Sequence, residues 1–457
     1  MSAAATGLHA DQLGETLARL AAANGIRQWD LGAACSSDTS VQVDRGEPKQ
    51  LKGAQRSSIT VRVWNGDGLV GTTSTSDLSD SGLERALSGA QAASAFGNPD
   101  DTPAFSPLAT APVAPLDQPL HEPQGILQLL TTLKDAEQQL LARHQAIGTV
   151  PYNGLAERSS ERLYLNSDGA RRQQRLTTAS VYLYARAEET GRKPRSAGAM
   201  RLAYGAGDLD IAGCINEAAE RTISHLDYAP IETGHYTCVF SPEAFLDLIG
   251  AFSSLFNARA VLDGVSLSNR DSLGQTLAVP FLDLHDNGLH PGNIGASAFD
   301  GEGTPTQRLA LVEGGVIKNF LHSEATARAF GVAPTGHAGL GAKVSVGPDW
   351  FEIGPTPGAP GAQSGLDQNR HPGPLVVIDS LSALHAGVKA SQGAFSLPFD
   401  GWLIQNGERR SIEAATVASD IRTLLKGLVG FEGDAKITPD GVCPSVWVDG
   451  LSITGEA

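Results

Sequence analysis

The chain has 457 residues, which is too many for one ordinary hydrophobic core, so we expect two domains of about 200 residues each. Its 41% hydrophobic and 18% charged residues exclude an intrinsically disordered protein. The net charge of −16 argues against a nucleic-acid partner, because contacts to phosphates need clustered lysine and arginine side chains.

Helices and strands alternate in the first part of the chain. The pattern predicts a helix over residues 9–24 and then short strands, of which 58–64 alternates apolar and polar residues. The Asn-Gly and Asp-Gly pairs that follow predict a hairpin turn back into residues 69–75. Ser81 and Glu84 fit the S-x-x-E capping box, so we expect the next helix to begin there.

A proline-rich loop is predicted over residues 99–125. Beyond it, apolar residues recur on one helical face, namely at Ile126, Leu129, Leu130, Leu133 and Leu140. Strands are predicted over 147–187 and a helix over 208–226. One face of the last of these strands is formed by Val181, Leu183 and Ala185. This order predicts an α+β fold.

A domain boundary is predicted near residue 230. It separates an N-terminal α+β domain (1–230) from a mainly antiparallel β domain with a few helices (231–457). In the second domain, Ser241 and Pro242 predict the start of a helix. Its apolar stripe comprises Phe245, Leu248, Ile249, Phe252 and Phe256.

Strands dominate the rest of the second domain. Hairpins are predicted over 309–321 and 401–412, a low-complexity loop over 354–374, a helix over 419–427 and a closing strand over 445–453.

The four cysteines and the N-terminal sequence predict where in the cell the protein is found. Cys35, Cys214, Cys238 and Cys443 are far apart and form no C-x-x-C pair, which is typical of a reducing compartment and excludes a zinc ribbon. The N-terminus lacks the pattern of a secretion signal, and no stretch approaches the roughly 20 apolar residues of a membrane span. We therefore expect a cytoplasmic protein without a membrane partner.

Two short motifs match known catalytic patterns only in part. Residues 66–71 read G-x-G-x-x-G, but strand residues follow where a dinucleotide site needs a helix, so a hairpin turn is the better interpretation. Ser297 lies in a near match to the G-x-S-x-G nucleophile motif, in which Phe299 replaces the second glycine.

Acidic and histidine residues gather between positions 283 and 302. His285 and His290, with Asp283 and Asp286, offer ligands for a divalent ion, although a surface turn explains the same residues.

Asp300 and Glu302 stand two residues apart among glycines. If this segment is extended, both carboxylates face one side, and they then form a metal or proton-transfer site. The structural alternative is a tight turn in which Asp300 accepts hydrogen bonds from nearby backbone N–H groups. The residues alone favour the turn.

Long segments resemble the TldD/PmbA family, once described as modulators of DNA gyrase. They are residues 58–87, 268–339, 384–408 and the tail from 420 onward. The resemblance implies two α+β domains and a cytoplasmic peptidase built from two related subunits that trim or degrade peptides and partly unfolded proteins. The signature positions that it covers are Asp300, Glu302, Gly303, Thr335 and Gly336. The resemblance suggests that they form a turn beside a substrate channel or a subunit contact.

The resemblance also sorts the chain between the two subunit types. The TldD type carries a His-Glu-x-x-x-His helix and a later cysteine that bind catalytic zinc, whereas the TldE/PmbA type lacks them. That helix is expected at about 249–256, where this chain reads IGAFSSLF and offers no ligand. Cys443 has no clear counterpart and cannot hold zinc alone. We therefore expect no catalytic residue, no metal and no cofactor in this chain.

The resemblance implies a TldD-type partner subunit that carries zinc, and a peptide or unfolded-protein substrate. The sequence does not decide between this heterodimer and a homodimer. Two alternatives remain: a self-associating binding or regulatory protein without a peptidase role, and a peptidase with an unrecognised site at His285, His290, Asp300 and Glu302.

Overall fold

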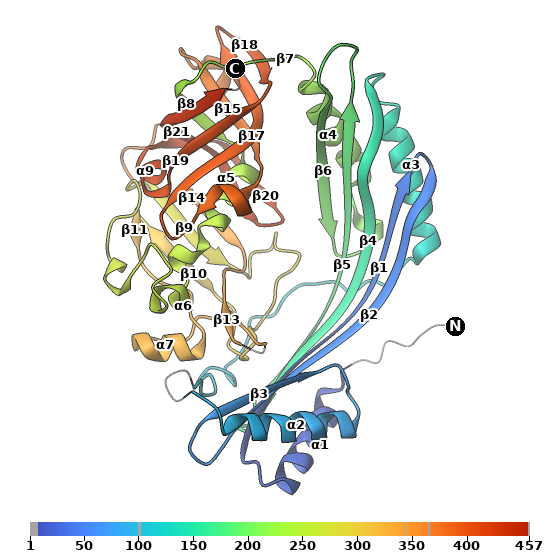
Figure 1. Ribbon diagram of the computed structural model, residues 1–457, viewed down its shortest axis with the longest axis vertical. Coiled ribbons are helices and arrows are strands. Elements are labelled where there is room, and N and C mark those ends of the chain that lie inside the picture. The colour runs from blue at the N-terminus through green and yellow to red at the C-terminus, as the bar shows by residue number, and fades with distance from the viewer. Residues whose placement is uncertain (1–7, 99–101, 342, 364–365, 456–457) are drawn as a thin grey trace.

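The computed structural model describes residues 8–98, 102–341, 343–363 and 366–455. The fold is α+β, as predicted: helices and an antiparallel sheet form the N-terminal part, and the C-terminal part is rich in strands (Figure 1). Within those ranges, no helix is both long and apolar enough to cross a membrane.

Six of the described strands form the first sheet, in the order β3-β2-β1-β4-β5-β6. Their bounds are β1 (Gln28–Asp44), β2 (Glu47–Trp64), β3 (Val70–Thr75), β4 (Ile147–Asn166), β5 (Arg171–Ala187) and β6 (Arg195–Ala203). The predicted hairpin is confirmed, because β2 ends at Trp64 and β3 pairs with it from Val70. The G-x-G-x-x-G stretch is therefore a turn that leads into a strand.

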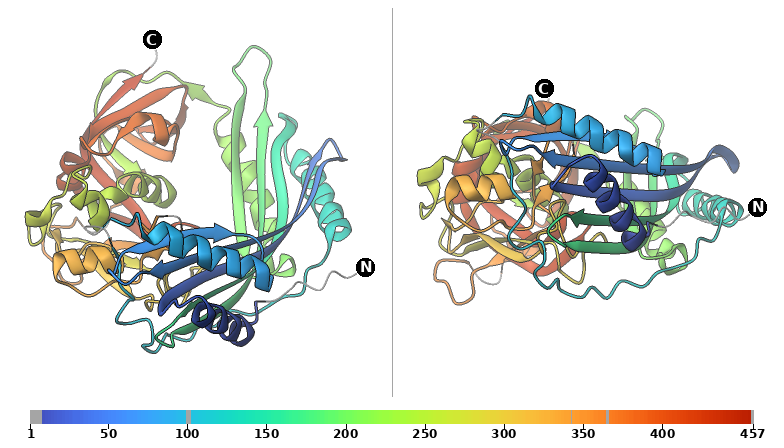
Figure 2. Two further views of the ribbon diagram at one scale, coloured as in Figure 1. Left: turned by 60° about the horizontal axis from the view of Figure 1, so that its bottom comes forward. Right: turned by 90° about the horizontal axis from the view of Figure 1, so that it is seen from below.

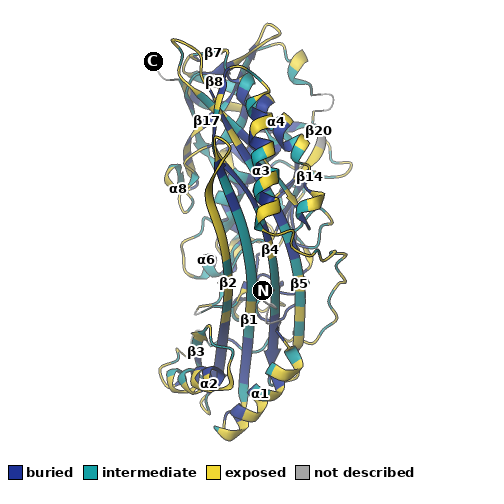
Figure 3. Ribbon diagram, turned by 90° about the vertical axis from the view of Figure 1, so that its right-hand side faces the viewer, coloured by how far each residue is buried: buried dark blue, intermediate teal, exposed yellow. Residues whose placement is uncertain are grey.

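One face of this sheet is covered by four helices: α1 (Ala10–Ala23), α2 (Asp80–Ser94), α3 (Ile126–Leu141) and α4 (Ile211–Ser224). Leu31 and Val41 lie an even number of residues apart on β1, so both point to this face. Leu31 packs with α1 and α2 at one end, and Val41 packs with α3 and α4 at the other. Figure 2 shows α1 and α2 at one end of the first sheet, and Figure 3 shows α3 and α4 in front of its strands toward the other end. The predicted inward face of β5 is confirmed by the burial of Val181, Leu183 and Ala185.

The predicted start of α2 is wrong by two residues. The N-cap is Ser79, whose extended backbone directs its Oγ to accept a hydrogen bond from Gly82 N at 3.2 Å. Ser81 already lies in the first helical turn. The sequence pattern S-x-x-E matched Ser81, but a cap is decided by which hydroxyl reaches the free N–H three residues on.

Most of the remaining described strands form a second sheet of thirteen strands. They are β7 (Tyr228–Ala229), β8 (Gly234–Phe240), β9 (Leu282–Asn287), β10 (Arg308–Glu313), β11 (Val316–Ile317), β14 (Phe351–Pro355), β15 (Leu375–Leu381), β16 (Val388–Lys389), β17 (Ala394–Gln405), β18 (Glu408–Ile412), β19 (Ala415–Asp420), β20 (Leu428–Thr438) and β21 (Gly441–Gly455). A separate pair is formed by β12 (Ala338–Gly339) and β13 (Ser345–Val346). Both predicted hairpins are confirmed, as β10–β11 and β17–β18. Most pairs are antiparallel, but β8–β15, β14–β21 and β7–β18 are parallel.

Short helices accompany the second sheet. Their bounds are α5 (Pro242–Ala251), α6 (Ala258–Leu262), α7 (Glu324–Phe330), α8 (Leu384–Gly387) and α9 (Ile421–Lys426). The cap by Ser241 is confirmed, since its side chain accepts a hydrogen bond from Ala244 N at 3.0 Å. The predicted helix ends earlier than its apolar stripe: α5 stops at Ala251, and a 3₁₀ turn carries Phe256 into the same core.

Candidate functional site

Two adjoining cavities lie between the uncovered face of the first sheet and the C-terminal part. Their volumes are about 780 Å³ and about 1200 Å³. The smaller cavity is bordered by β1, β2, β4 and two loop segments, at residues 295–301 and 336–340. The larger cavity is bordered by β5, β6, α5 and the β20–β21 turn. Four residues line both, namely Arg162, Gly295, Ser297 and Asp349. The arrangement is a cleft between the two parts of the molecule, large enough for several residues of a peptide.

Asp300 fixes a turn at the wall of the smaller cavity. Its Oδ1 accepts hydrogen bonds from Glu302 N at 2.8 Å and Thr304 N at 2.9 Å, and its Oδ2 accepts one from Ala338 N at 3.0 Å. Burial and the neighbouring Glu302 raise the pKa of Asp300 to about 7.

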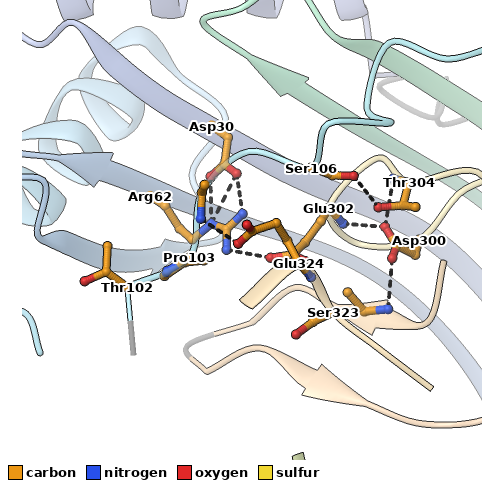
Figure 4. A network of polar contacts seen from close by, with 12 residues as sticks. Asp30, Arg62, Thr102, Pro103, Ser106, Asp300, Glu302, Thr304, Ser323 and Glu324 are labelled. Atoms are coloured by element: carbon orange, nitrogen blue, oxygen red, sulfur yellow. Dashed lines mark hydrogen bonds and ion pairs between the residues drawn. The ribbon is translucent and has the colours of Figure 1, made fainter. Parts of the chain in front are cut away.

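Glu302 performs a different role, away from the cavity (Figure 4). Its Oε1 accepts from Arg62 Nη1 at 3.0 Å and its Oε2 accepts from Glu324 N at 2.8 Å, with the side chain fully buried. Arg62 in turn donates from Nε to Asp30 Oδ1 at 2.9 Å. The idea that both carboxylates face one site is therefore wrong, because the segment is a turn rather than an extended strand. Glu302 joins the C-terminal part to the first sheet.

The other signature positions are explained by close backbone approach. Gly303 has a φ of +76°, and a Cβ there would lie 2.5 Å from the Tyr164 ring. Gly336 has a φ of +84°, and its Cβ would lie 2.5 Å from Pro305 O. Thr335 is buried beside it. These residues hold the turn against the sheet.

A buried group that the sequence analysis missed lies at the same cavity. His337 Nε2 is 3.0 Å from Asp286 Oδ1, its Nδ1 is 2.9 Å from Thr335 Oγ1, and Asp286 Oδ2 accepts from Asp349 N at 2.8 Å. Thr335 Oγ1 is also 3.2 Å from His322 O, which we assign as the acceptor of its proton. His337 Nδ1 then donates to Thr335, so the ring makes two N–H bonds as an imidazolium.

The pKa of His337 agrees with a positively charged ring. Burial lowers the pKa of His337, but its hydrogen bond to Asp286 and the Asp286 charge outweigh burial and raise it above the usual value. Asp349 borders both cavities, and desolvation together with the Asp286 charge raises its pKa to about 6. In the described ranges, Asp286, His337 and Asp349 are the one His/Cys/Asp/Glu group with ligand atoms close enough for a metal, within 4.8 Å of one another. A proton between His337 and Asp286 explains the same contacts.

The histidines that the sequence analysis singled out lie elsewhere. His285 Nε2 is 3.7 Å from Glu313 Oε1, and His290 stacks on Trp350 at a centroid distance of 4.5 Å. Successive side chains alternate along β9, so Asp286 points away from His285 and toward His337. The structure does not assemble His285, His290, Asp300 and Glu302 into one site.

Asp283 and Ser297 have structural partners. Asp283 Oδ1 accepts from Gly314 N at 2.8 Å in the β10–β11 turn. Ser297 Oγ donates to Phe299 O at 2.7 Å and accepts from Arg162 Nη1 at 2.8 Å. The hydroxyl of Ser297 thus orients an arginine.

The segment expected to correspond to a zinc helix is part of the core. Ile249, Phe252, Leu255 and Phe256 are all buried there. Cys443 is fully buried as well, and burial raises the pKa of its thiol far above the usual range. The thiol stays protonated and packs against its neighbours.

Models of the PmbA/TldD family match the chain in succession. The PmbA/TldA metallopeptidase domain 1 matches residues 36–94, the central domain residues 120–226 and the C-terminal domain residues 233–455. The chain is 22% identical over 424 residues to the metalloprotease PmbA of Escherichia coli O157:H7, which covers 91% of this chain and 90% of the relative.

Solved structures share the fold. A Thermotoga maritima MSB8 protein, whose name connects it with modulation of a DNA gyrase, superposes with a TM-score of 0.86 at 24% identity, over 97% of this chain and 100% of that one. TldE from Thermococcus kodakarensis superposes with a TM-score of 0.81 at 17% identity, over 97% and 99%. Because the family models follow one another along most of the sequence, this chain belongs to the PmbA/TldD family of metallopeptidase-related proteins.

Proposed function

We propose that this chain is a non-catalytic, TldE/PmbA-like subunit of a cytoplasmic heterodimeric zinc metallopeptidase. A TldD-type partner brings the zinc and the general base, and the complex degrades or trims peptides and unfolded proteins. One observation carries the proposal: in a metallopeptidase-related fold with a large cleft, the segment 249–256 is apolar core without a ligand.

The cleft supports a peptide substrate. Strand β6 is the last strand of the first sheet, and its residues 198–202 line the larger cavity. Its outer edge pairs with no other described strand, and side chains of α4 bond only part of it, at Ala197 O and Ala199 O. The remaining backbone groups are offered to an extended peptide by strand addition. Exposed apolar side chains surround the same cavity, namely Tyr184, Met200, Leu202 and Ile437. Backbone pairing with apolar contacts suits peptides of varied sequence.

The partner interface is proposed on the C-terminal part. Of the two hairpins considered, β10–β11 lies at the end of the second sheet, whereas β18 is covered by β7 only at Ser411 and Ile412. The outer edge of β11 is already bonded by residues 274–277 of the same chain. The outer edge of β18 at residues 408–410 pairs with no described strand, and a related subunit would cover it.

Mixing the purified chain with a TldD-type subunit tests the proposal. We expect peptidase activity that neither subunit shows alone, and no stoichiometric zinc in this chain by metal analysis. A complex that fails to form, with no gain in activity, leaves the self-associating binding protein as the better account. One tightly held zinc per chain that is lost in Asp349→Asn and His337→Gln indicates a peptidase with its own site instead.

A further inference from the structure

Arginines that border the cleft differ in their partners. The five that line the two cavities are Arg56, Arg158, Arg162, Arg201 and Arg221. Four are paired with carboxylates at 2.7–3.6 Å: Arg56 and Arg158 with Asp38, Arg201 with Glu217, and Arg221 with Asp379. Among the described residues, Arg162 has no carboxylate within the 4.0 Å of an ion pair. It is a cation at the junction of both cavities without a bound counter-charge.

The guanidinium of Arg162 is held in place without being neutralised. Nη1 donates to Ser297 Oγ at 2.8 Å, and the Ser297 proton is already given to Phe299 O. The Phe299 ring lies under the guanidinium, with its centroid 4.9 Å from Cζ. A serine acceptor and an aromatic face fix the orientation of an arginine at little entropic cost when a ligand arrives.

We propose that Arg162 binds a carboxylate of the peptide that occupies the cleft. An arginine fork binds a carboxylate through two parallel N–H bonds, and the ligand enters from either cavity because Arg162 borders both. The carboxylate comes from the C-terminus of the peptide or from an Asp or Glu side chain. This inference rests on the proposed peptide substrate and specifies how it is recognised.

Two carboxylates of the described residues lie near Arg162, but neither forms an ion pair with it. Asp300 and Asp349 are the acidic groups that act on Arg162. The carboxylate of Asp300 is occupied by three backbone N–H groups, and an oxygen of the Asp349 carboxylate lies within 4.8 Å of ligand atoms of Asp286 and His337.

Peptide binding to the full-length chain tests this assignment. The probes are three fluorescein-labelled nonapeptides of alanine, valine and leucine: one with a free C-terminal carboxylate, one amidated, and one amidated with a central glutamate. By fluorescence anisotropy we expect a carboxylate peptide to bind at least about 10-fold more tightly than the neutral amide. Arg162→Gln is expected to remove that preference, and Arg162→Lys to weaken it, because lysine keeps the charge but loses the fork.

Arg158→Gln is the matched control, since Arg158 lies on the same strand and cavity but is already paired with Asp38. It is expected to keep the preference. Tight binding of the free acid alone assigns a C-terminal carboxylate, and tight binding of the glutamate peptide assigns a side chain. Equal affinity of the wild-type chain for all three peptides overturns the inference, and so does an equal loss of affinity for all three in Arg162→Gln. Either result still agrees with the proposed peptide substrate. No binding of any peptide overturns the proposed substrate and the inference with it.

Discussion

At the residue scale, Arg62 decides how the two parts of the molecule are joined. Its side chain is 2% exposed and contacts Asp30 on the first sheet and Glu302 in the turn at residues 300–304. Tyr164 donates a further hydrogen bond to Asp30 Oδ2 at 3.0 Å. A buried cation between two buried carboxylates is stable only while all members are present.

We predict that Arg62→Leu destabilises the protein by about 3–5 kcal/mol, because it leaves Asp30 and Glu302 buried without a counter-charge. Urea unfolding followed by circular dichroism measures the change. The control is Arg19→Leu, which removes an ion pair with Asp80 that is mostly exposed. Similar effects of the two substitutions would contradict the assigned role of Arg62.

His337 gives the protein a pH-dependent stability. Its folded pKa is raised above the usual value, since the Asp286 contact outweighs burial. A raised histidine pKa stabilises the folded state below the unfolded pKa, and this contribution is lost as pH rises through the folded pKa. We therefore predict that His337→Gln costs more stability at pH 6 than at pH 9, by urea unfolding at both values. His235→Gln, at an exposed histidine, is the control. An equal cost at both pH values would show that His337 is neutral.

At the element scale, the hairpin turns were predicted best from the sequence. Glycine-containing pairs predicted the β2–β3, β10–β11 and β17–β18 hairpins because the turn itself requires such residues. The β1–β2 hairpin was missed as a long element, although its strands run over Gln28–Asp44 and Glu47–Trp64. Nearly every residue from 47 to 58 is exposed, so no alternation of apolar and polar residues marks the strand (Figure 3).

The cap of α2 provides a test at this scale. Ser79→Ala is predicted to lower the free energy of unfolding by about 1 kcal/mol, because Gly82 N loses its acceptor. Ser81→Ala is expected to have little effect, since Ser81 is exposed inside the first turn. Thermal unfolding compares the two variants. A larger loss for Ser81→Ala would restore the capping box read from the sequence.

For the whole molecule, charge governs which macromolecules the protein attracts. With a net charge of −16, and with four of the five cleft arginines neutralised by carboxylates, we predict no useful affinity for duplex DNA at about 0.15 M salt. A gel-shift titration at that salt concentration measures it. Submicromolar, salt-sensitive binding would contradict the prediction and support a direct role at DNA.

The sequence by itself determined the α+β class, the glycine-containing hairpins and the turn at Asp300, because hydrophobic alternation and glycine act over a few neighbouring positions. It also identified Asp300 as a residue that fixes a turn. Only the tertiary structure decided which side chains meet: Glu302 with Arg62, 240 residues away, Asp286 with His337, and Arg162 with Ser297. These contacts bring together strands and turns far apart in the chain, and local spacing carries no information about such distances. The cleft and its unpaired arginine exist for the same reason, since both arise only where the first sheet faces the C-terminal part.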